Sequence, residues 1–292
     1  SLINLATIAL IWWIGRQWFG RFPALLISTF YALTPTVLVH SRSSWNPNVM
    51  PFFVLITMYG VWKVWRFGYW RWLVILAISY AFVLQSHYLG LLLGPVIGLF
   101  LFLSPKKPNY KRSAVSALFL FLVLMSPLLI FDIRHNWINS QAIYNFFSNR
   151  QTTVNFRAYK AIPHLWPIWV NLNSTLLAAQ NRILSQILSV ALLLGTFVSL
   201  KRKLNSPDLI FVFVWLSIGL IGLGLYKQHI YDHYYGFLFP VPFLLFGFLI
   251  RTAGYWSVFL LAPLLVVNIL NNPLRFPPNN QAGSNHRRPG TK

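Results

Sequence analysis

The sequence contains no cysteine and only three acidic residues among its 292 positions. The absence of cysteine excludes disulfide bonds, thiolate nucleophiles and cysteine-ligated metal sites. Charged residues make up 9% of the chain and hydrophobic residues make up 57%, which is far from the composition of a soluble domain. Any chemistry that needs a side-chain carboxylate therefore depends on Asp132, Asp208 or Asp232.

Apolar runs of about 17–20 residues, the length that a helix needs to cross roughly 30 Å of hydrocarbon, recur along the chain, and the first run is shorter. We therefore expect an all-α protein, a polytopic transmembrane helical bundle of about ten spans. Residues 72–103 are too long for one crossing, and the polar stretch Gln85–Tyr88 predicts a tight helical hairpin there. The expected spans are 2–14, 22–40, 49–65, 70–86, 88–104, 113–131, 183–200, 208–226, 235–250 and 253–270.

The formal net charge of +21 comes from short basic clusters between the apolar runs. Because these clusters form neither a basic helix face nor a linear basic tract, we expect no binding to nucleic acid. Lysine and arginine are concentrated in alternate loops, and the positive-inside rule places those loops in the cytoplasm. The large loop 132–182 then lies outside, where its composition predicts amphipathic interfacial helices.

The chain is expected to form one transmembrane domain, residues 1–272, which includes the external loop and is followed by a disordered basic tail, residues 273–292. Ser1 begins inside an apolar run without methionine or a basic leader, so we expect the natural start of the protein to lie upstream. Ser206, Pro207 and Asp208 have the pattern of a helix start, which gives Asp208 a capping role on the cytoplasmic side.

The side chains suited to chemistry gather on the predicted outer side. All seven histidines fall there or in the outer tail, together with Asp132 and Asp232. Four outer segments carry them: the end of the second span, the turn between the fourth and fifth, the end of the sixth, and the connection between the eighth and ninth. Their candidate residues are Arg42 and Asn46; His87 and Tyr88; Asp132, Arg134 and His135; and Lys227, His229, Asp232, His233 and Tyr234.

Each group also has a purely structural explanation. Arg42 could cap helix-end carbonyls, and Asp132 could pair with a neighbouring cation. His229, Asp232 and His233 have the i, i+3, i+4 spacing that places three metal ligands on one helical face, but a structural site needs four ligands. No cofactor is identifiable from the sequence, and a divalent metal remains an open alternative.

Three outer cations, Arg42, Arg134 and Lys227, are suited to phosphate, arginine through bidentate hydrogen bonds and lysine as a point charge. An anionic lipid-linked substrate that enters from the outer leaflet would meet them at headgroup depth. We therefore expect membrane lipids and a lipid-linked phosphate substrate as partners.

Four short motifs resemble those of one group of membrane enzymes. They are Ser41-Arg42-x-x-Trp45-Asn46-Pro47-Asn48, Gln85-x-His87-Tyr88, Phe131-Asp132-x-Arg134-His135-Asn136 and Tyr231-Asp232-His233-Tyr234. Over roughly residues 1–281 the chain resembles bacterial GT-C glycosyltransferases related to protein O-mannosyltransferases and aminoarabinose transferases, truncated at the N-terminus. The resemblance implies a many-span helical fold in the bacterial inner or plasma membrane. It also implies inverting transfer of a sugar from a polyprenyl-phosphate donor to an acceptor on the extracytoplasmic face.

The resemblance assigns roles as well. In such enzymes a carboxylate in the first external loop acts as base or organises the donor site, and we expect it upstream of Ser1. Asp132 and Asp232 are the catalytic candidates within the chain. The substrate-binding candidates are Arg42, Asn46, His87, Tyr88, Arg134, His135, Lys227, His233 and Tyr234. The alternatives are a lipid or small-solute transporter or flippase, and an inactive fragment of such an enzyme.

Overall fold

The computed structural model describes residues 2–106, 108, 110–202 and 207–273. Within these residues the chain is helical, and its one β interaction is an isolated bridge between Val154 and Tyr226. The helices are α1 (Leu2–Trp18), α2 (Arg21–Leu33), α3 (Pro35–Ser41), η1 (Asn46–Val49), α4 (Met50–Phe67), α5 (Trp72–Ser86), η2 (Tyr88–Leu92), α6 (Leu93–Phe102), α7 (Tyr110–Arg134), α8 (Ile138–Ser148), α9 (Arg150–Thr153), η3 (Ala158–Ala161), α10 (Ile162–Leu176), α11 (Arg182–Arg202), α12 (Pro207–Gly224), η4 (Asp232–Phe237), α13 (Pro240–Ala253), η5 (Gly254–Ser257) and α14 (Val258–Leu270). The predicted tail lies outside the described residues from position 274 onwards.

The all-α prediction is confirmed, but the count of about ten spans is wrong. Four helices are long and apolar enough to cross a membrane: Tyr110–Arg134, Arg182–Lys201, Pro207–Gly224 and Pro240–Leu270. A fifth is formed if α2 and α3, which meet at an angle of 61°, count as one bent span.

The number of membrane spans was overestimated because hydropathy alone does not show where a helix ends. Helices occur at all ten predicted positions, yet α1, α2, α5 and α6 have only 17, 13, 15 and 10 residues. The last two predicted spans join in one apolar segment of 31 residues. In α4, Lys63 and Arg66 lower the hydropathy of an otherwise apolar helix.

The predicted external loop of interfacial helices also needs correction. Helix α8 has no buried residue, as expected of a helix that lies at a surface. Helix α10, in contrast, buries Trp169, Leu172 and Leu176 and packs against α11 and α12. It is therefore part of the helical bundle and not an interfacial helix.

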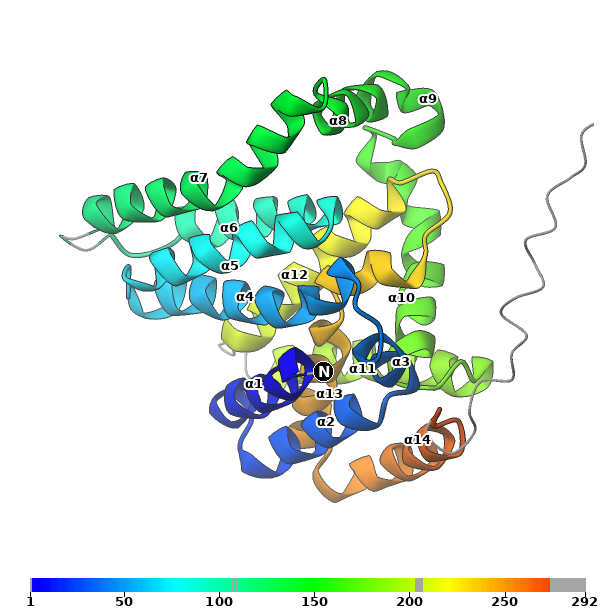
Figure 1. Cartoon of the computed structure of the whole chain (residues 1–292). Helices are drawn as coiled ribbons and strands as arrows, with labels where there is room; N and C mark the ends of the chain where they lie inside the picture. The colour runs from blue at the N-terminus through cyan, green and yellow to red at the C-terminus, as the bar shows by residue number, and fades with distance from the viewer. Residues whose placement is uncertain (1, 107, 109, 203–206, 274–292) are drawn as a thin grey trace, which may run out of the picture.

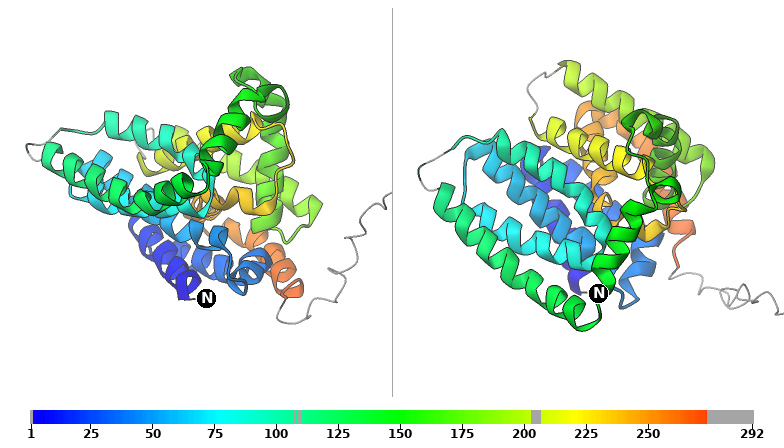
Figure 2. Two further views of the ribbon diagram at one scale, coloured as in Figure 1. Left: turned by 45° about the horizontal axis from the view of Figure 1, so that its top comes forward. Right: turned by 90° about the horizontal axis from the view of Figure 1, so that it is seen from above.

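Successive helices from α4 to α7 run antiparallel, so alternate connections between them lie at the same end of the bundle. The connections from α4 to α5 and from α6 to α7 lie together at the left of Figure 1. The turns η1 and η2 lie at the opposite ends of the same helices. In the second view of Figure 2, α7 flanks this layer along its outer edge. Of the apolar stretch of α7, 6% of residues are buried inside the protein, so most of this helix faces its surroundings.

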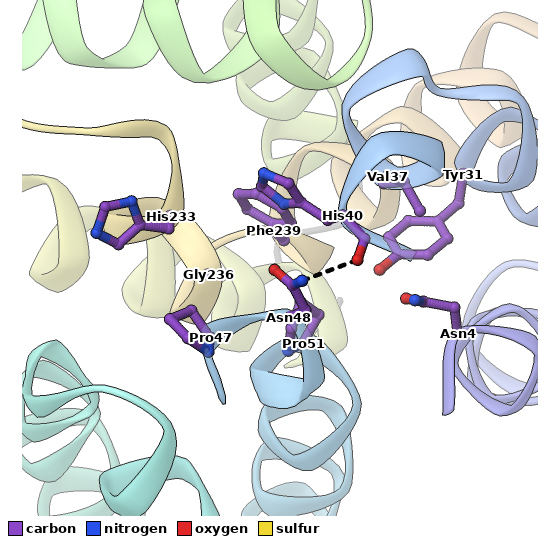
Figure 3. Close-up of a pocket in the computed structure, with 10 residues that line it drawn as sticks. All are labelled: Asn4, Tyr31, Val37, His40, Pro47, Asn48, Pro51, His233, Gly236 and Phe239. Carbon is purple, nitrogen blue, oxygen red and sulfur yellow. Dashed lines mark hydrogen bonds between the residues drawn. The ribbon is translucent and has the colours of Figure 1, made fainter. Parts of the chain in front are cut away.

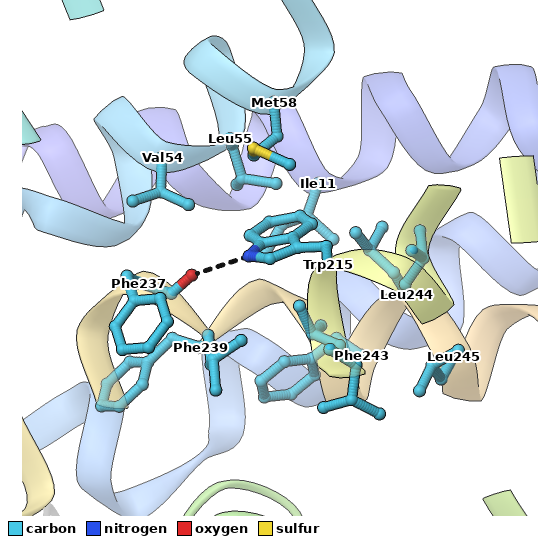
Figure 4. Close-up of a cluster of buried hydrophobic side chains, with 14 of the residues drawn as sticks. Ile11, Val54, Leu55, Met58, Trp215, Phe237, Phe239, Phe243, Leu244 and Leu245 are labelled. Atoms are coloured by element: carbon cyan, nitrogen blue, oxygen red, sulfur yellow. Dashed lines mark hydrogen bonds between the residues drawn. The ribbon is translucent and has the colours of Figure 1, made fainter. Parts of the chain in front are cut away.

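A cluster of buried side chains holds α1, α4, α12 and α13 together (Figure 4). Trp215 of α12 is its central residue: 1% of its surface is exposed, and its indole Nε1 donates to the Phe237 carbonyl at 3.2 Å. A buried indole N–H needs such a partner, since an unpaired polar group in an apolar interior is costly. The bond fixes the end of η4 against α12 and so positions the residues that precede it.

The C-terminal end of α10 is buried and is capped by side chains from other helices. Thr34 Oγ1 donates to the Leu176 carbonyl at 2.9 Å, and Asn268 Nδ2 donates to the Leu177 carbonyl at 2.6 Å. Thr36 Oγ1 donates to the Thr175 carbonyl at 2.8 Å. The last carbonyls of a helix have no partner within the helix, so these bonds replace the water that an exposed end would use.

We predict that Thr34→Val will destabilise the fold by about 1–3 kcal/mol, because it leaves the buried Leu176 carbonyl without this donor. Thermal unfolding in detergent measures the loss. The matched control is Thr152→Val, which removes a local hydroxyl bond at an exposed position. Equal losses in the two variants would contradict the capping role of Thr34.

Candidate functional site

Three of the four predicted outer segments meet in space. They contain η1, η2 and η4, three short 3-10 turns that each lead into a longer helix. Turn η4 contacts both η1 and η2, although it lies more than 130 residues beyond them along the chain. The antiparallel order of α4 and α5 brings η1 and η2 to one end of the bundle, and the Trp215 bond holds η4 beside them.

His233 lies at the centre of a group of rings that we call the aromatic cluster. Its ring centroid is 4.5 Å from Trp45, 5.6 Å from His87 and 4.6 Å from Tyr234. The cluster consists of Trp45, His87, Tyr88, Tyr231, His233 and Tyr234. The structure thus brings together His87, Tyr88, His233 and Tyr234, four of the predicted substrate-binding residues.

A pocket opens beside His233, and we call it the polar pocket (Figure 3). It is lined by Asn4, Tyr31, Val37, His40, Pro47, Asn48, Pro51, His233, Gly236 and Phe239. Its empty volume is about 300 Å³, but the part that a water-sized sphere can occupy is about 10 Å³. That space holds about one water molecule or one hydroxyl group.

The local backbone fixes the proton of His87. Its Nδ1 accepts a hydrogen bond from the Leu89 backbone N–H at 3.2 Å, so in the neutral ring the proton is on Nε2. Burial, and then the neighbouring His233, lower the pKa of His87 from its ordinary 6.5 to about 4. At neutral pH this ring is therefore uncharged and its Nε2 is a hydrogen-bond donor.

Asp232 places a carboxylate next to this group. It is exposed at the start of η4, and its negative charge reaches His40, His233 and Tyr235. Burial lowers the pKa of His233, and the charge of Asp232 opposes that effect. Asp232 is the predicted catalytic acid that lies at the aromatic cluster.

Asp132, the other predicted catalytic acid, has a structural environment. The carboxylate is 4% exposed and accepts hydrogen bonds from the backbone N–H groups of Asn139, at 2.7 Å, and Ser140, at 3.1 Å. The Ser140 hydroxyl also donates to it. A carboxylate at the start of a helix satisfies N–H groups that have no partner in the first turn. Asp132 thus ties the end of α7 to the start of α8.

The other residues of that segment lie apart from the aromatic cluster. Arg134 is exposed at the end of α7, and the His135 ring stacks on Phe131 at 4.0 Å. Among the hydrogen bonds and ring contacts of the described residues, those of Asp132 and His135 are to their own segment and the start of α8.

The remaining predicted residues differ in their partners. Arg42 is exposed at the end of α3, two residues beyond the pocket residue His40. Asn46 is exposed at the start of η1. The ammonium group of Lys227 donates to the carbonyls of Arg150, at 3.1 Å, and Gln151, at 2.7 Å, which ties the α9 segment to the loop before η4.

The candidate metal ligands do not form the helical face that their spacing suggested. His229 lies in an irregular stretch without helix, and η4 begins only at Asp232. Over the ranges 2–106, 110–202 and 207–273, no group of three or more histidine or acidic side chains is placed to hold a metal ion.

Four polar residues of the pocket were not among the predicted site residues: Asn4, Tyr31, His40 and Asn48. Asn4 and Tyr31 lay within predicted membrane spans. A polar side chain inside such a span is costly and usually has a function or a partner, which is the signal that could have identified them.

Residues 1–131 match the protein family described as dolichyl-phosphate-mannose-protein mannosyltransferase. This part of the chain is therefore similar to a family of GT-C glycosyltransferases. The matched residues include Arg42, Asn48 and His87, and they end before Asp132 and the η4 segment. No curated protein and no solved structure matches the chain.

We predict that the protein loses stability as the pH falls from about 6.5 towards 4. The pKa of His87 is lower in the folded protein than in the unfolded chain, so the unfolded chain binds the proton more readily. The contribution of neutral His87 to the free energy of unfolding is therefore complete above pH 6.5. It is lost as the pH falls towards about 4. His87→Asn keeps an acceptor for the Leu89 N–H but cannot titrate, so its melting temperature should change less over this range.

Melting temperatures at pH 7 and pH 5 in detergent measure the effect. The control is His164→Asn, at an exposed position of α10. A pH dependence that is the same in His87→Asn as in the unmodified protein would show that His87 does not contribute.

Proposed function

We propose that the protein transfers a sugar from a polyprenyl-phosphate-linked donor to an acceptor on the extracytoplasmic face of the membrane. The observation that carries the proposal is the convergence of three polar segments, distant in sequence, on the aromatic cluster, which lies beside one pocket. The family of residues 1–131 supports the type of reaction, since its description names transfer of mannose from dolichyl phosphate.

The separation of charge along the bundle supports the proposed face. The end of α4, with Lys63 and Arg66, and the start of α7, with Lys111, lie at the same end of the bundle as the connections that carry Arg71 and Lys106. The aromatic cluster lies at the opposite end. Basic connections mark the cytoplasmic side of membrane proteins, so the cluster would face outwards.

The reaction breaks the bond between C1 of the sugar and the phosphate oxygen, and forms a bond from C1 to the acceptor oxygen or nitrogen. The bonding electrons leave with the phosphate, and the proton of the acceptor passes to a base. In this proposal Arg42 stabilises the leaving phosphate, because its exposed guanidinium is close in sequence to the pocket wall and suits phosphate geometry.

Asp232 is the carboxylate that we propose as the base within this chain. It lies beside His40 and His233, and its exposed side chain is open to an incoming acceptor. Asp132 is a less suitable base, because three atoms of α8 already donate hydrogen bonds to its oxygens and hold the α7–α8 junction.

We predict opposite effects for the same substitution at the two acids. Asp232→Asn should lower the rate of sugar transfer by about 10²–10⁴-fold, as expected for loss of a general base, and leave the melting temperature unchanged. Asp132→Asn should lower the melting temperature, because an amide nitrogen cannot accept the N–H groups of Asn139 and Ser140.

The assay measures transfer of labelled sugar from polyprenyl-phosphate mannose, with this chain and with the complete gene product. Full activity of Asp232→Asn would eliminate this residue as the base. Movement of the lipid across vesicle membranes without cleavage of the sugar would instead favour a flippase.

The two outer arginines provide a second matched pair. Arg42→Gln should weaken binding of polyprenyl phosphate by about 10–100-fold, because hydrogen bonds between charged groups are among the strongest. Arg134→Gln should have a smaller effect, since Arg134 lies on the α7 end away from the cluster. Titration of the lipid against the purified protein measures both, and a larger effect at Arg134 would move the phosphate site to that segment.

A further inference from the structure

Asn48 has an amide whose orientation is fixed by three acceptors. Its Nδ2 donates to the His40 carbonyl at 2.8 Å, the Ser43 carbonyl at 3.0 Å and the Ser43 hydroxyl at 2.8 Å. A flipped amide would turn its oxygen towards two carbonyl oxygens, which is repulsive. The nitrogen must therefore face the α3 end, and the oxygen must face the other way.

The amide oxygen of Asn48 is buried and has no hydrogen-bond partner. The residue is 8% exposed and lines the polar pocket. Figure 3 shows this oxygen turned away from the His40 carbonyl, towards the side of the pocket where His233 lies. A buried acceptor without a partner costs free energy, so this position favours a ligand group that donates a hydrogen bond.

The lining of the pocket indicates the kind of donor. Its ten residues include no aspartate, glutamate, lysine or arginine, so nothing in the wall would neutralise an ammonium group or a phosphate. The free space in the pocket, about 10 Å³, admits about one hydroxyl-sized group. A neutral hydroxyl fits both limits.

The aromatic cluster lies next to this space and provides a surface for the rest of the ligand. His233 belongs to both, since it lines the pocket and its ring contacts Trp45 at 4.5 Å. Trp45 is 50% exposed, and Tyr231 is 53% exposed. Exposed rings beside a hydroxyl-sized polar pocket suit a sugar, which has apolar C–H faces and hydroxyl groups at its edge.

We propose that Asn48 Oδ1 accepts a hydrogen bond from one hydroxyl group of the transferred sugar, while the sugar ring lies against the aromatic cluster. The inference rests on the proposed function and adds to it a specificity residue within the chain. It also separates two tasks: the sugar hydroxyl enters the uncharged pocket, and the phosphate stays outside, near Arg42.

The test compares the binding of polyprenyl-phosphate mannose with that of its 2-, 3-, 4- and 6-deoxy analogues. In the unmodified protein, one analogue should bind about tenfold more weakly than the parent, because it leaves the Asn48 oxygen unpaired. In Asn48→Ala, the parent should bind as weakly as that analogue, and the difference between the two should disappear.

Ser43→Ala is the matched control. It removes one acceptor of the Asn48 amide nitrogen and leaves the amide oxygen in place, so the preference for the parent over the deoxy analogue should persist. A tenfold difference that survives in Asn48→Ala would overturn the proposal. If Asn48→Ala fails to fold, equal binding of the parent and all four analogues by the unmodified protein would overturn it as well.

Polyprenyl phosphate without a sugar separates this inference from the proposed function. Binding of neither polyprenyl phosphate nor polyprenyl-phosphate mannose would contradict the proposed function itself. Binding of both with equal affinity would keep the lipid-phosphate substrate and overturn sugar recognition by Asn48. Tighter binding of the mannose form, lost in Asn48→Ala and retained in Ser43→Ala, is the expected result.

Discussion

The need to satisfy backbone groups wherever a helix stops inside an apolar environment governs this structure. Water cannot supply the missing partners in hydrocarbon, so side chains must do so. Thr34 and Asn268 bond the end of α10, Asn48 bonds the end of α3, and Asp132 bonds the start of α8. The breaks in the helices therefore explain why these four polar residues occur in an apolar chain.

This constraint also explains how much of the fold could be predicted. The positions of the helices follow from apolar runs, and each predicted segment contains a helix. The span count fails because a run of apolar residues does not reveal the bend at Thr34 or the shortness of α6. Those breaks depend on partners far away in the sequence, such as the Leu176 carbonyl, which lies 142 residues from Thr34.

The candidate site, too, could be predicted only in part. Three outer segments could be grouped because alternate turns of an antiparallel bundle lie at the same end, and the structure brings His87, Tyr88, His233 and Tyr234 together. Asp132 was grouped with them on sequence alone, because a carboxylate followed by Arg134 and His135 has the composition of a polar site. Its bonds to residues seven and eight positions later become visible only once α8 is folded.

Asn48 and His87 each satisfy a backbone group and keep one polar atom for a ligand, so they link the fold to the proposed chemistry. Asn48 uses its nitrogen for the α3 end and has its oxygen left over, and His87 uses Nδ1 for the Leu89 N–H and has Nε2 left over. In each case the backbone bond fixes which atom remains, one an acceptor and the other a donor. Neutral groups held in this way suit a hydroxyl better than an ion, which agrees with our proposal that the phosphate of the lipid-linked substrate stays outside the pocket, near the exposed Arg42.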